Sequence, residues 1–375
     1  MKQKFFALIT CLSMLFCFTL QSSAIAASPS TSPEEYIFQQ ISAIRSNDVT
    51  CPWNDETTIS AIITLYNLDD IKNGYVFNLS TDGIETGFIQ IHCIEDEYSL
   101  YCYAFSGNSE VECMADFWGY DLSKTNIYFL GSFKYLILDK TGYLDLSTNS
   151  LIELDTSTLK TLENSYTAQV QSEPVSLIPS SSLIDTSSLI MPLGYEDDYV
   201  WPITDDFSNL TITYNGKSQK VSKHCGPTAA TGIIGCLNHL GKITVPSGDK
   251  VKDTFEKLYI SLNTNNIRFN SLTTGGTAWN QVDVGIRWYG RTYGCDVSAE
   301  LSNSNSISSI KSALTKGYIL QVGVKNFDNT SGGHFIVVTG CSTDTGILYV
   351  QNGWSRNSVQ YPYSSLDIVN YTYVG

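Results

Sequence analysis

Residues 225–241 read CGPTAATGIIGCLNHLG, and they carry the clearest structural pattern of the C-terminal half. Apolar side chains recur at positions 233, 234, 237 and 240, which is the spacing of one face of a helix. Pro227 stands where a first-turn proline is tolerated, and Gly241 is a common helix stop. The stretch therefore predicts a helix with Cys225 at or just before its N-terminus.

A thiol in that position is a candidate nucleophile. Unpaired N–H groups and the positive end of the helix dipole favour thiolate over thiol, which lowers the pKa of a cysteine. A disulfide is the alternative, but eleven helical residues separate Cys225 from Cys236 by about 16 Å, beyond disulfide reach. A bridge from Cys225 to Cys295 or Cys341 stays open.

The base that would activate this thiol must come from the C-terminal half, because His92 lies in the other half. His224 is adjacent to the thiol, and its side chain should point away from it. His239 lies about 21 Å along the same helix. His334 remains; it follows two glycines and begins the apolar run 335–338, which predicts a strand. We expect His334 to be the general base, with ordinary packing of a strand histidine as the alternative.

Three segments in this order resemble the papain-like cysteine peptidase superfamily: CGPTA from 225, GGHFIVVTG from 332 and QNGW from 351. The first resembles bacterial leader-peptidase-like domains, and the last is more similar to streptopain and papain. The resemblance covers residues 196–375. It implies an α+β fold in which the cysteine helix packs on an antiparallel sheet.

The resemblance also implies roles for three more residues. Asn352 would orient the imidazole, and Trp354 would shield their hydrogen bond from water. Gln219, six residues before Cys225, would complete an oxyanion hole with the Cys225 N–H. The alternatives are that Asn352 only forms a turn with Gly353 and that Gln219 is an exposed strand residue. Asp344 is a weaker substitute for the orienting role.

The first residues predict export. A basic start, the apolar run 5–20 and small residues at 24–27 are typical of a signal peptide, which we place at residues 1–26. A membrane anchor is the less favoured interpretation, because polar residues interrupt the run. We therefore expect a secreted product, with retention in the cell wall as an alternative and no membrane attachment in the mature form.

Charge and cysteine spacing exclude some classes of function. The chain has 22 basic and 37 acidic residues and a formal charge of −15. Loss of Lys2 and Lys4 with the signal makes this more negative, which disfavours nucleic-acid binding. The eight cysteines after the signal form no CxxC pair, so we expect no zinc site and no cofactor. In an oxidising compartment their default state is the disulfide.

The rest of the chain divides into an N-terminal domain and a linker. A capped helix is expected at 32–47, followed by short β-type runs from 57 to 154, of which 127–138 is one. This gives a β-rich α+β domain over 27–160, a Ser-rich linker over 161–195 and the catalytic domain over 196–375. In the last we expect a hairpin around Asn215-Gly216, helices at 251–262, 278–289 and 306–314, and strands from 318.

Together these features predict a secreted cysteine peptidase that acts on proteins or peptides and is made as a zymogen. The N-terminal domain would be a propeptide and intramolecular inhibitor, with a permanent accessory domain as the alternative. Two other functions remain open: a cell-wall amidase or transpeptidase with the same thiol chemistry, and a catalytically silent surface-binding protein.

Overall fold

The computed structural model describes residues 31–48, 50–95, 97–131, 133–152, 154–172, 189–190, 199–246, 250–270, 272, 275–302, 304–325, 333–342 and 345–375. Residues 1–26, where we expect a signal peptide, and Asp344 lie outside these ranges. Within the described ranges, no helix is long and apolar enough to cross a membrane.

The N-terminal half is built on a four-stranded antiparallel meander. Its helices are α2 (Pro33–Asn47), α3 (Glu110–Trp118) and α4 (Thr156–Ser172). Its strands are β1 (Thr57–Tyr66), β2 (Lys72–Thr81), β3 (Ile84–Ile94), β4 (Glu97–Ala104), β5 (Ile127–Phe129), β6 (Tyr135–Asp139), β7 (Gly142–Asp145) and β8 (Ser150–Leu151). β5 joins β1 in parallel and leads into the antiparallel β6, β7 and β8.

The C-terminal half combines a helical layer with a second group of strands. Its helices are α5 (Cys225–His239), α6 (Val251–Ser261), α7 (Val282–Tyr293) and α8 (Ile307–Thr315). Its strands are β9 (Leu189–Ile190), β10 (Thr211–Tyr214), β11 (Lys217–Lys220), β12 (Ala299–Ser302), β13 (Ile319–Lys325), β14 (Gly333–Ser342), β15 (Ile347–Gln351), β16 (Val359–Pro362) and β17 (Ile368–Val374). The 3-10 turns are η2 (Thr204–Phe207), η3 (Thr264–Asn266), η4 (Trp279–Gln281) and η5 (Tyr363–Ser365).

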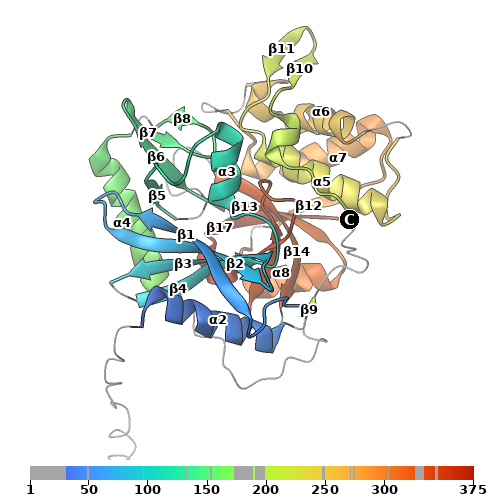
Figure 1. Cartoon of the computed structure of the whole chain (residues 1–375). Helices are drawn as coiled ribbons and strands as arrows, with labels where there is room; N and C mark the ends of the chain where they lie inside the picture. Colours follow the sequence, from blue (N-terminus) through green and yellow to red (C-terminus); the bar gives the residue numbers. More distant parts are fainter. Residues whose placement is uncertain are drawn as a thin grey trace, which may run out of the picture.

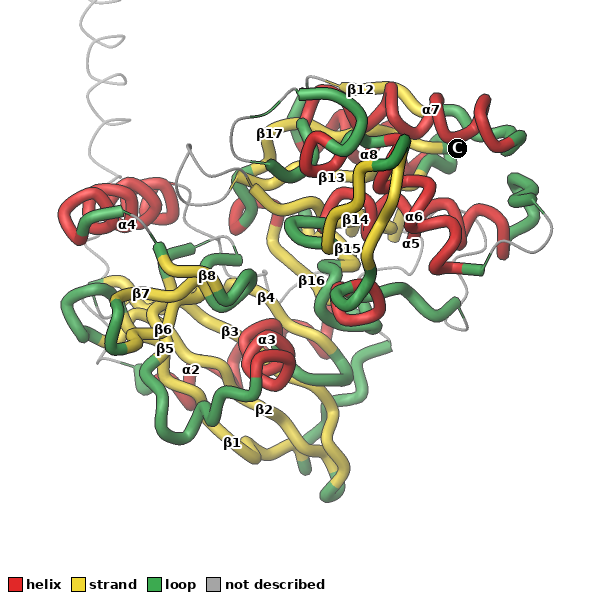
Figure 2. The backbone as a smooth tube through the Cα atoms, turned by 90° about the horizontal axis from the view of Figure 1, so that it is seen from above, coloured by secondary structure: helices red, strands yellow, loops and turns green. Residues whose placement is uncertain are grey.

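One sheet runs through both halves, in the order β12-β17-β13-β14-β15-β16-β4-β3-β2-β1-β5-β6-β7-β8. The junction is the antiparallel pairing of β16 with β4, at Gln360 and Tyr103. Figures 1 and 2 show α5, α6 and α7 on one side of the C-terminal strands and the N-terminal sheet on the other.

β14 is the strand on which the two layers meet. Phe335 and Val337 pack in one core with α5, because alternate side chains of a strand point to opposite faces. Ile336 and Val338 point the other way, into a core that α3, the β5–β6 hairpin and α8 also supply. Burial of both faces explains why this strand is a continuous apolar run.

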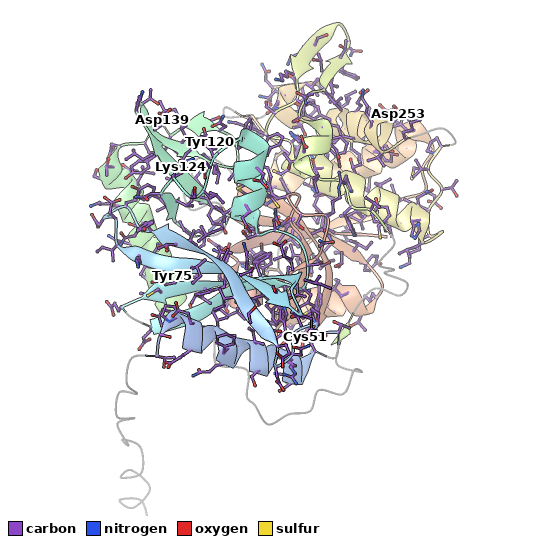
Figure 3. All side chains as sticks on the ribbon, viewed as in Figure 1. Cys51, Tyr75, Tyr120, Lys124, Asp139 and Asp253 are labelled. Atoms are coloured by element: carbon purple, nitrogen blue, oxygen red, sulfur yellow. The ribbon has the colours of Figure 1, made fainter. Side chains whose placement is uncertain are left out.

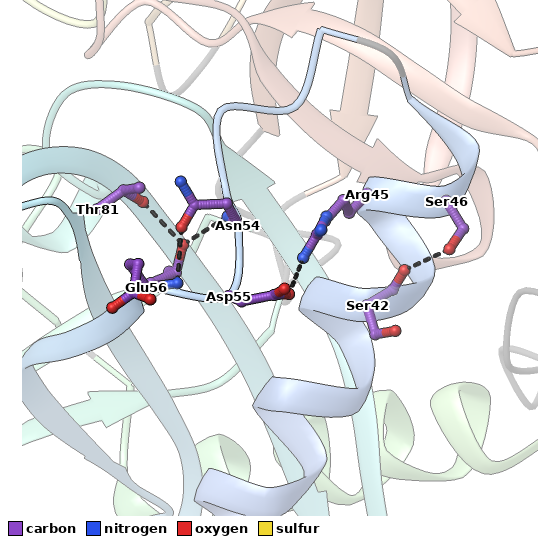
Figure 4. A network of polar contacts seen from close by, with 8 residues as sticks. Ser42, Arg45, Ser46, Asn54, Asp55, Glu56 and Thr81 are labelled. Atoms are coloured by element: carbon purple, nitrogen blue, oxygen red, sulfur yellow. Dashed lines mark hydrogen bonds and ion pairs between the residues drawn. The ribbon is translucent and has the colours of Figure 1, made fainter.

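The polar connection between α2 and β1 is also well defined (Figure 4). Ser32 and Glu35 form a capping box at the start of α2, as the sequence predicts. Near its end Arg45 pairs with Asp55, and Asn54 accepts from the Glu56 N–H at 2.7 Å. These local bonds fix the direction in which the chain enters the sheet.

The structure confirms several predicted elements. They are the helix after Ser32, the cysteine helix, the helices near 251, 282 and 307, and the strands near 319, 334 and 347. The hairpin turns at Asn215 (φ 50°) and Gly216 (φ 78°), both in the left-handed region that an Asn-Gly turn requires.

Three predictions about the N-terminal half need correction. The run 127–138 is not one strand, because main-chain bonds of Lys134 with Leu130 and Gly131 close a turn that divides it into β5 and β6. Residues 161–172, expected to begin the linker, belong to α4, which lies at the outer edge of the N-terminal half (Figure 1). Helix α3 lies in a region where we expected only strands.

The eight cysteines of the described residues form no disulfide bridges. Four of them, Cys102, Cys236, Cys295 and Cys341, are buried. The others are partly buried, including Cys51, which is labelled in Figure 3 near the end of α2. The disulfide interpretation is therefore wrong for this part of the chain, and Cys225 is an unbridged thiol.

Candidate active site

Cys225 is the first residue of α5, and neighbouring segments fix its position. The buried amide of Gln321 on β13 donates to the Gly226 carbonyl at 3.0 Å. A Cβ on Gly226 would lie 2.7 Å from Thr277 Oγ1, so only glycine fits beside that residue. The start of α5 is thereby held between β13 and the segment that precedes α7.

His334 is the second residue of β14 and lies opposite Val324 of β13. The glycine before it is required by packing, because a Cβ on Gly333 would lie 2.1 Å from the Trp279 ring. Gly323 is in the same situation, with Trp279 at 2.3 Å from the built Cβ. The indole thus lies directly on the main chain of β13 and β14 next to the histidine.

Cys225 and His334 line one pocket, and each is half-buried. Main chain and apolar side chains make most of its wall. The described residues that line it are Trp201, Pro202, Cys225, Thr228, Ala229, Gly232, His334, Phe335, Val337, Gln351 and Gly353. The structure therefore brings the predicted nucleophile and base to the same cavity.

The imidazole of His334 is oriented by a main-chain carbonyl. Its Nε2 lies 2.6 Å from the backbone oxygen of Asn352. A carbonyl only accepts, so Nε2 carries the hydrogen, and Nδ1 is left as the basic nitrogen. This tautomer is the one that a general base needs.

The side chain of Asn352 is engaged elsewhere. Its Oδ1 accepts from the N–H groups of Trp354 and Ser355 at 2.9 and 3.0 Å. Its Nδ2 donates to Oε1 of Glu110 at 2.9 Å. In this structure Asn352 therefore meets the imidazole through its carbonyl, and its amide faces the N-terminal half.

Glu110 begins α3 and is fully buried. Burial raises the pKa of its carboxyl to about 8, although hydrogen bonds to Asn352 and Tyr135 act in the opposite direction. The Tyr135 hydroxyl lies 3.4 Å from Oε2 of Glu110 and donates to Gln90 at 2.9 Å. A neutral Glu110 can donate to the Tyr135 oxygen while its other oxygen accepts from Asn352, so the carboxyl is satisfied in its protonated form.

Phe133 contacts the imidazole from the turn between β5 and β6. Its ring centroid lies 5.1 Å from that of His334 and 5.5 Å from that of Tyr361. Its φ is 61°, a conformation that is strained for a bulky residue, and its N–H donates to the Tyr101 hydroxyl at 3.1 Å. The N-terminal half therefore supplies one wall around the histidine.

These surroundings favour neutral forms of both reactive groups. Burial raises the pKa of the Cys225 thiol, although N–H groups of Phe335 and Gly226 favour the thiolate. Burial also lowers the pKa of His334, although the Asn352 carbonyl and the charge of Asp145 act in the opposite direction. The pair is thus held as thiol and imidazole.

The two remaining predicted site residues lie in different surroundings. Trp354 is buried beside Asn352, with its ring 6.3 Å from Phe117 of α3. Gln219 lies on β11, where its amide donates to the Tyr259 hydroxyl at 3.1 Å and to the Thr264 carbonyl at 3.3 Å. Gln219 does not belong to the described residues that line the pocket.

Sequence reasoning missed the residues that the N-terminal half contributes. Glu110 and Phe133 lie more than 200 positions before their partners, and only the fold brings them together. The one local signal was Ser109 followed by Glu112, a capping box that marks the start of α3. Over the described residues, no cluster of His, Cys, Asp or Glu has the composition of a metal site.

Comparison with known proteins gives a family match within the C-terminal half of the chain. Residues 211–373 match the model of the Peptidase_C39 like family. A search of curated proteins finds no match. The matched range contains Cys225, His334 and Asn352, and the match supports a cysteine peptidase of the papain-like superfamily.

Proposed function

We propose that this chain is a secreted cysteine peptidase in which Cys225 is the nucleophile and His334 the general base. The observation that carries the proposal is their common pocket, with a thiol at a helix N-terminus and an imidazole whose Nε2 is fixed by the Asn352 carbonyl. The family match over residues 211–373 supports the same chemistry.

In the reactive state, Nδ1 of His334 takes the thiol proton, and the thiolate attacks a peptide carbonyl carbon. An S–C bond forms, and the electron pair of the carbonyl moves to its oxygen. When the intermediate collapses, the C–N bond breaks and the imidazolium gives its proton to the leaving amine. A water molecule, deprotonated by the imidazole, then cleaves the thioester and restores the thiol.

The charge on the carbonyl oxygen needs hydrogen-bond donors. The Cys225 N–H is at the start of α5, where main-chain N–H groups have no partner within the helix. We propose it as one donor. Gln219 stays a prediction for the second donor, and it would have to leave Tyr259 and Thr264 to serve.

We propose further that the protein is made as a zymogen. The signal at residues 1–26 supports export, and contacts of Glu110 and Phe133 with site residues support an inhibitory N-terminal half. Proteins or peptides would be the substrates, and the N-terminal half would be an intramolecular partner.

The test compares the whole chain with Cys225→Ala and with Cys236→Ala, a matched thiol deletion on the same helix. Each protein is incubated with an unfolded protein substrate, and new peptide ends are identified by mass spectrometry. We expect cleavage by wild type and Cys236→Ala and none by Cys225→Ala. Equal cleavage by all three would overturn the proposal.

A further inference from the structure

Two side chains of the N-terminal half contact the residues of the proposed catalytic group. The Glu110 carboxyl accepts from the amide of Asn352, and the Phe133 ring lies against the His334 imidazole. They come from different elements, α3 and the β5–β6 turn. Both reach the site from the face of β14 that packs on the N-terminal half.

The first contact keeps the Asn352 amide away from the imidazole. Nδ2 of Asn352 donates to Glu110, and its Oδ1 accepts from the N–H groups of Trp354 and Ser355. Both acceptor sites of Oδ1 are therefore in use, and the side chain has no acceptor left for His334. Among the described residues, Glu110 is the partner that draws this amide toward the N-terminal half.

The second contact covers part of the half-buried imidazole. Strand alternation places His334 on the same face as Ile336, and Phe133 lies over it there. Burial disfavours the protonated imidazole, and without imidazolium the thiolate of Cys225 loses its counter-charge. The ring thus acts against the ion pair that a thiol peptidase needs.

We propose that Glu110 and Phe133 form a latch by which the N-terminal half holds the site in a resting state. The latch rests on the proposed function, because it regulates the same thiol. Glu110 fixes Asn352, Phe133 covers His334, and loss of the two contacts would free both of these side chains.

Features of both Phe133 and Glu110 allow the latch to open. Phe133 holds a left-handed backbone conformation that is strained for a bulky residue and is relieved when the turn relaxes. Glu110 is a carboxyl that is stable in this place only while it is neutral. The strain at Phe133 favours opening at any pH, and Glu110 adds to it only when its carboxyl ionises.

Ionisation of Glu110 is one way to open it. The titratable groups that face it are Tyr135 of β6, Cys102 of β4 and Cys113 of α3. Burial raises the pKa of Cys102, raises that of Cys113 to about 12 and raises that of Glu110 to about 8, so we expect the carboxyl to ionise before either thiol. Above that pH a charged carboxyl would be enclosed without a cation, which weakens the closed state.

The experiment measures alkylation of Cys225 by iodoacetamide in the whole chain, with the labelled peptide identified by mass spectrometry. Glu110→Ala removes the acceptor, and Phe133→Gly removes the ring at a position where glycine suits φ. Glu110→Gln is the matched control, since its amide can still accept from Asn352 and donate to Tyr135. We expect labelling to be about tenfold faster in the first two variants and within about twofold of wild type in the third.

A second comparison uses only folded proteins and varies pH. The ratio of wild-type to Glu110→Gln labelling rates should be near one at pH 6.5 and should rise above pH 8, because only the carboxyl ionises. Unchanged or slower labelling in Glu110→Ala, or a ratio that stays constant with pH, would contradict the latch. Labelling does not require peptide cleavage. Faster labelling without any cleavage would therefore contradict the proposed peptidase function but not the latch.

Discussion

His334 is the residue on which the proposed chemistry depends most after the thiol itself. Among the described residues its imidazole makes one hydrogen bond, from Nε2 to the Asn352 carbonyl, so its removal should disturb the fold little. We expect His334→Ala to lower peptide cleavage by about 10²–10⁴-fold, the usual range for loss of a general base. His239→Ala, an exposed histidine on α5, is the control and should keep full activity. Equal losses in both variants would argue against the assigned base.

A substitution at Gly226 tests how the thiol of Cys225 is positioned. A methyl group there meets Thr277 at less than 3 Å, and overpacking of this kind costs about 1–3 kcal/mol. We expect Gly226→Ala to lower both the melting temperature and the rate of cleavage, because the start of α5 must move. The double variant Gly226→Ala/Thr277→Ala should recover part of both losses. If the single variant is as active as wild type, the position of Cys225 is not set by this contact.

At the scale of elements, α3 connects the two halves through its first turn. Ser109 caps this helix next to Glu110, and removal of such a cap costs about 1 kcal/mol. We expect Ser109→Ala to speed Cys225 alkylation in addition to lowering stability. Ser32→Ala removes the same kind of capping box from α2 and is the matched control. A similar change in alkylation in both variants would show that the effect is general loosening.

The elements that the sequence predicts well are those with strong local signals. The helix after Cys225 has a clear apolar period, and the Asn215-Gly216 hairpin has its own turn chemistry. The β5–β6 break was missed because apolar residues flank it on both sides, although Gly131 and Ser132 are turn residues that mark it locally. α4 was missed because its sequence is polar and Ser/Thr-rich.

The site residues also differ in whether neighbouring or distant parts of the sequence determine their positions. Cys225 and His334 could be chosen from helix reach and strand pattern, and the structure brings them to one pocket. The direction of the Asn352 amide could not be predicted from the sequence, because its partner Glu110 lies in the other half of the chain. The position of Gln219 depends on Tyr259 and Thr264, which meet it only through the packing of α6 and η3.

At the scale of the whole molecule, a single sheet and a shared core join the two halves. The core contains residues of β4, α3 and β6 together with residues of β13, β14 and β17. Glu110 lies inside this core, so its ionisation is coupled to the stability of the fold. This coupling gives a prediction about pH.

The folded state raises the pKa of Glu110 from 4.5 to about 8, so between these values the native protein binds a proton that the unfolded chain releases. Stability should therefore fall as pH rises through this range, by about 1.4 kcal/mol per pH unit, and then become level above it. Denaturant unfolding of wild type and Glu110→Gln between pH 5 and 9 measures this difference. Parallel curves for the two proteins would mean that Glu110 does not titrate in the fold.

The central claim is that Cys225 forms a thioester with the substrate. The most direct measurement mixes the whole chain, and the Phe133→Gly chain, with a peptide ester, quenches in acid and locates the added acyl mass by peptide mapping. We predict acylation of Cys225, release of the acyl group by hydroxylamine, and no adduct in Cys225→Ala. Turnover of the ester with no adduct at Cys225, or with the adduct at another residue, would contradict the account.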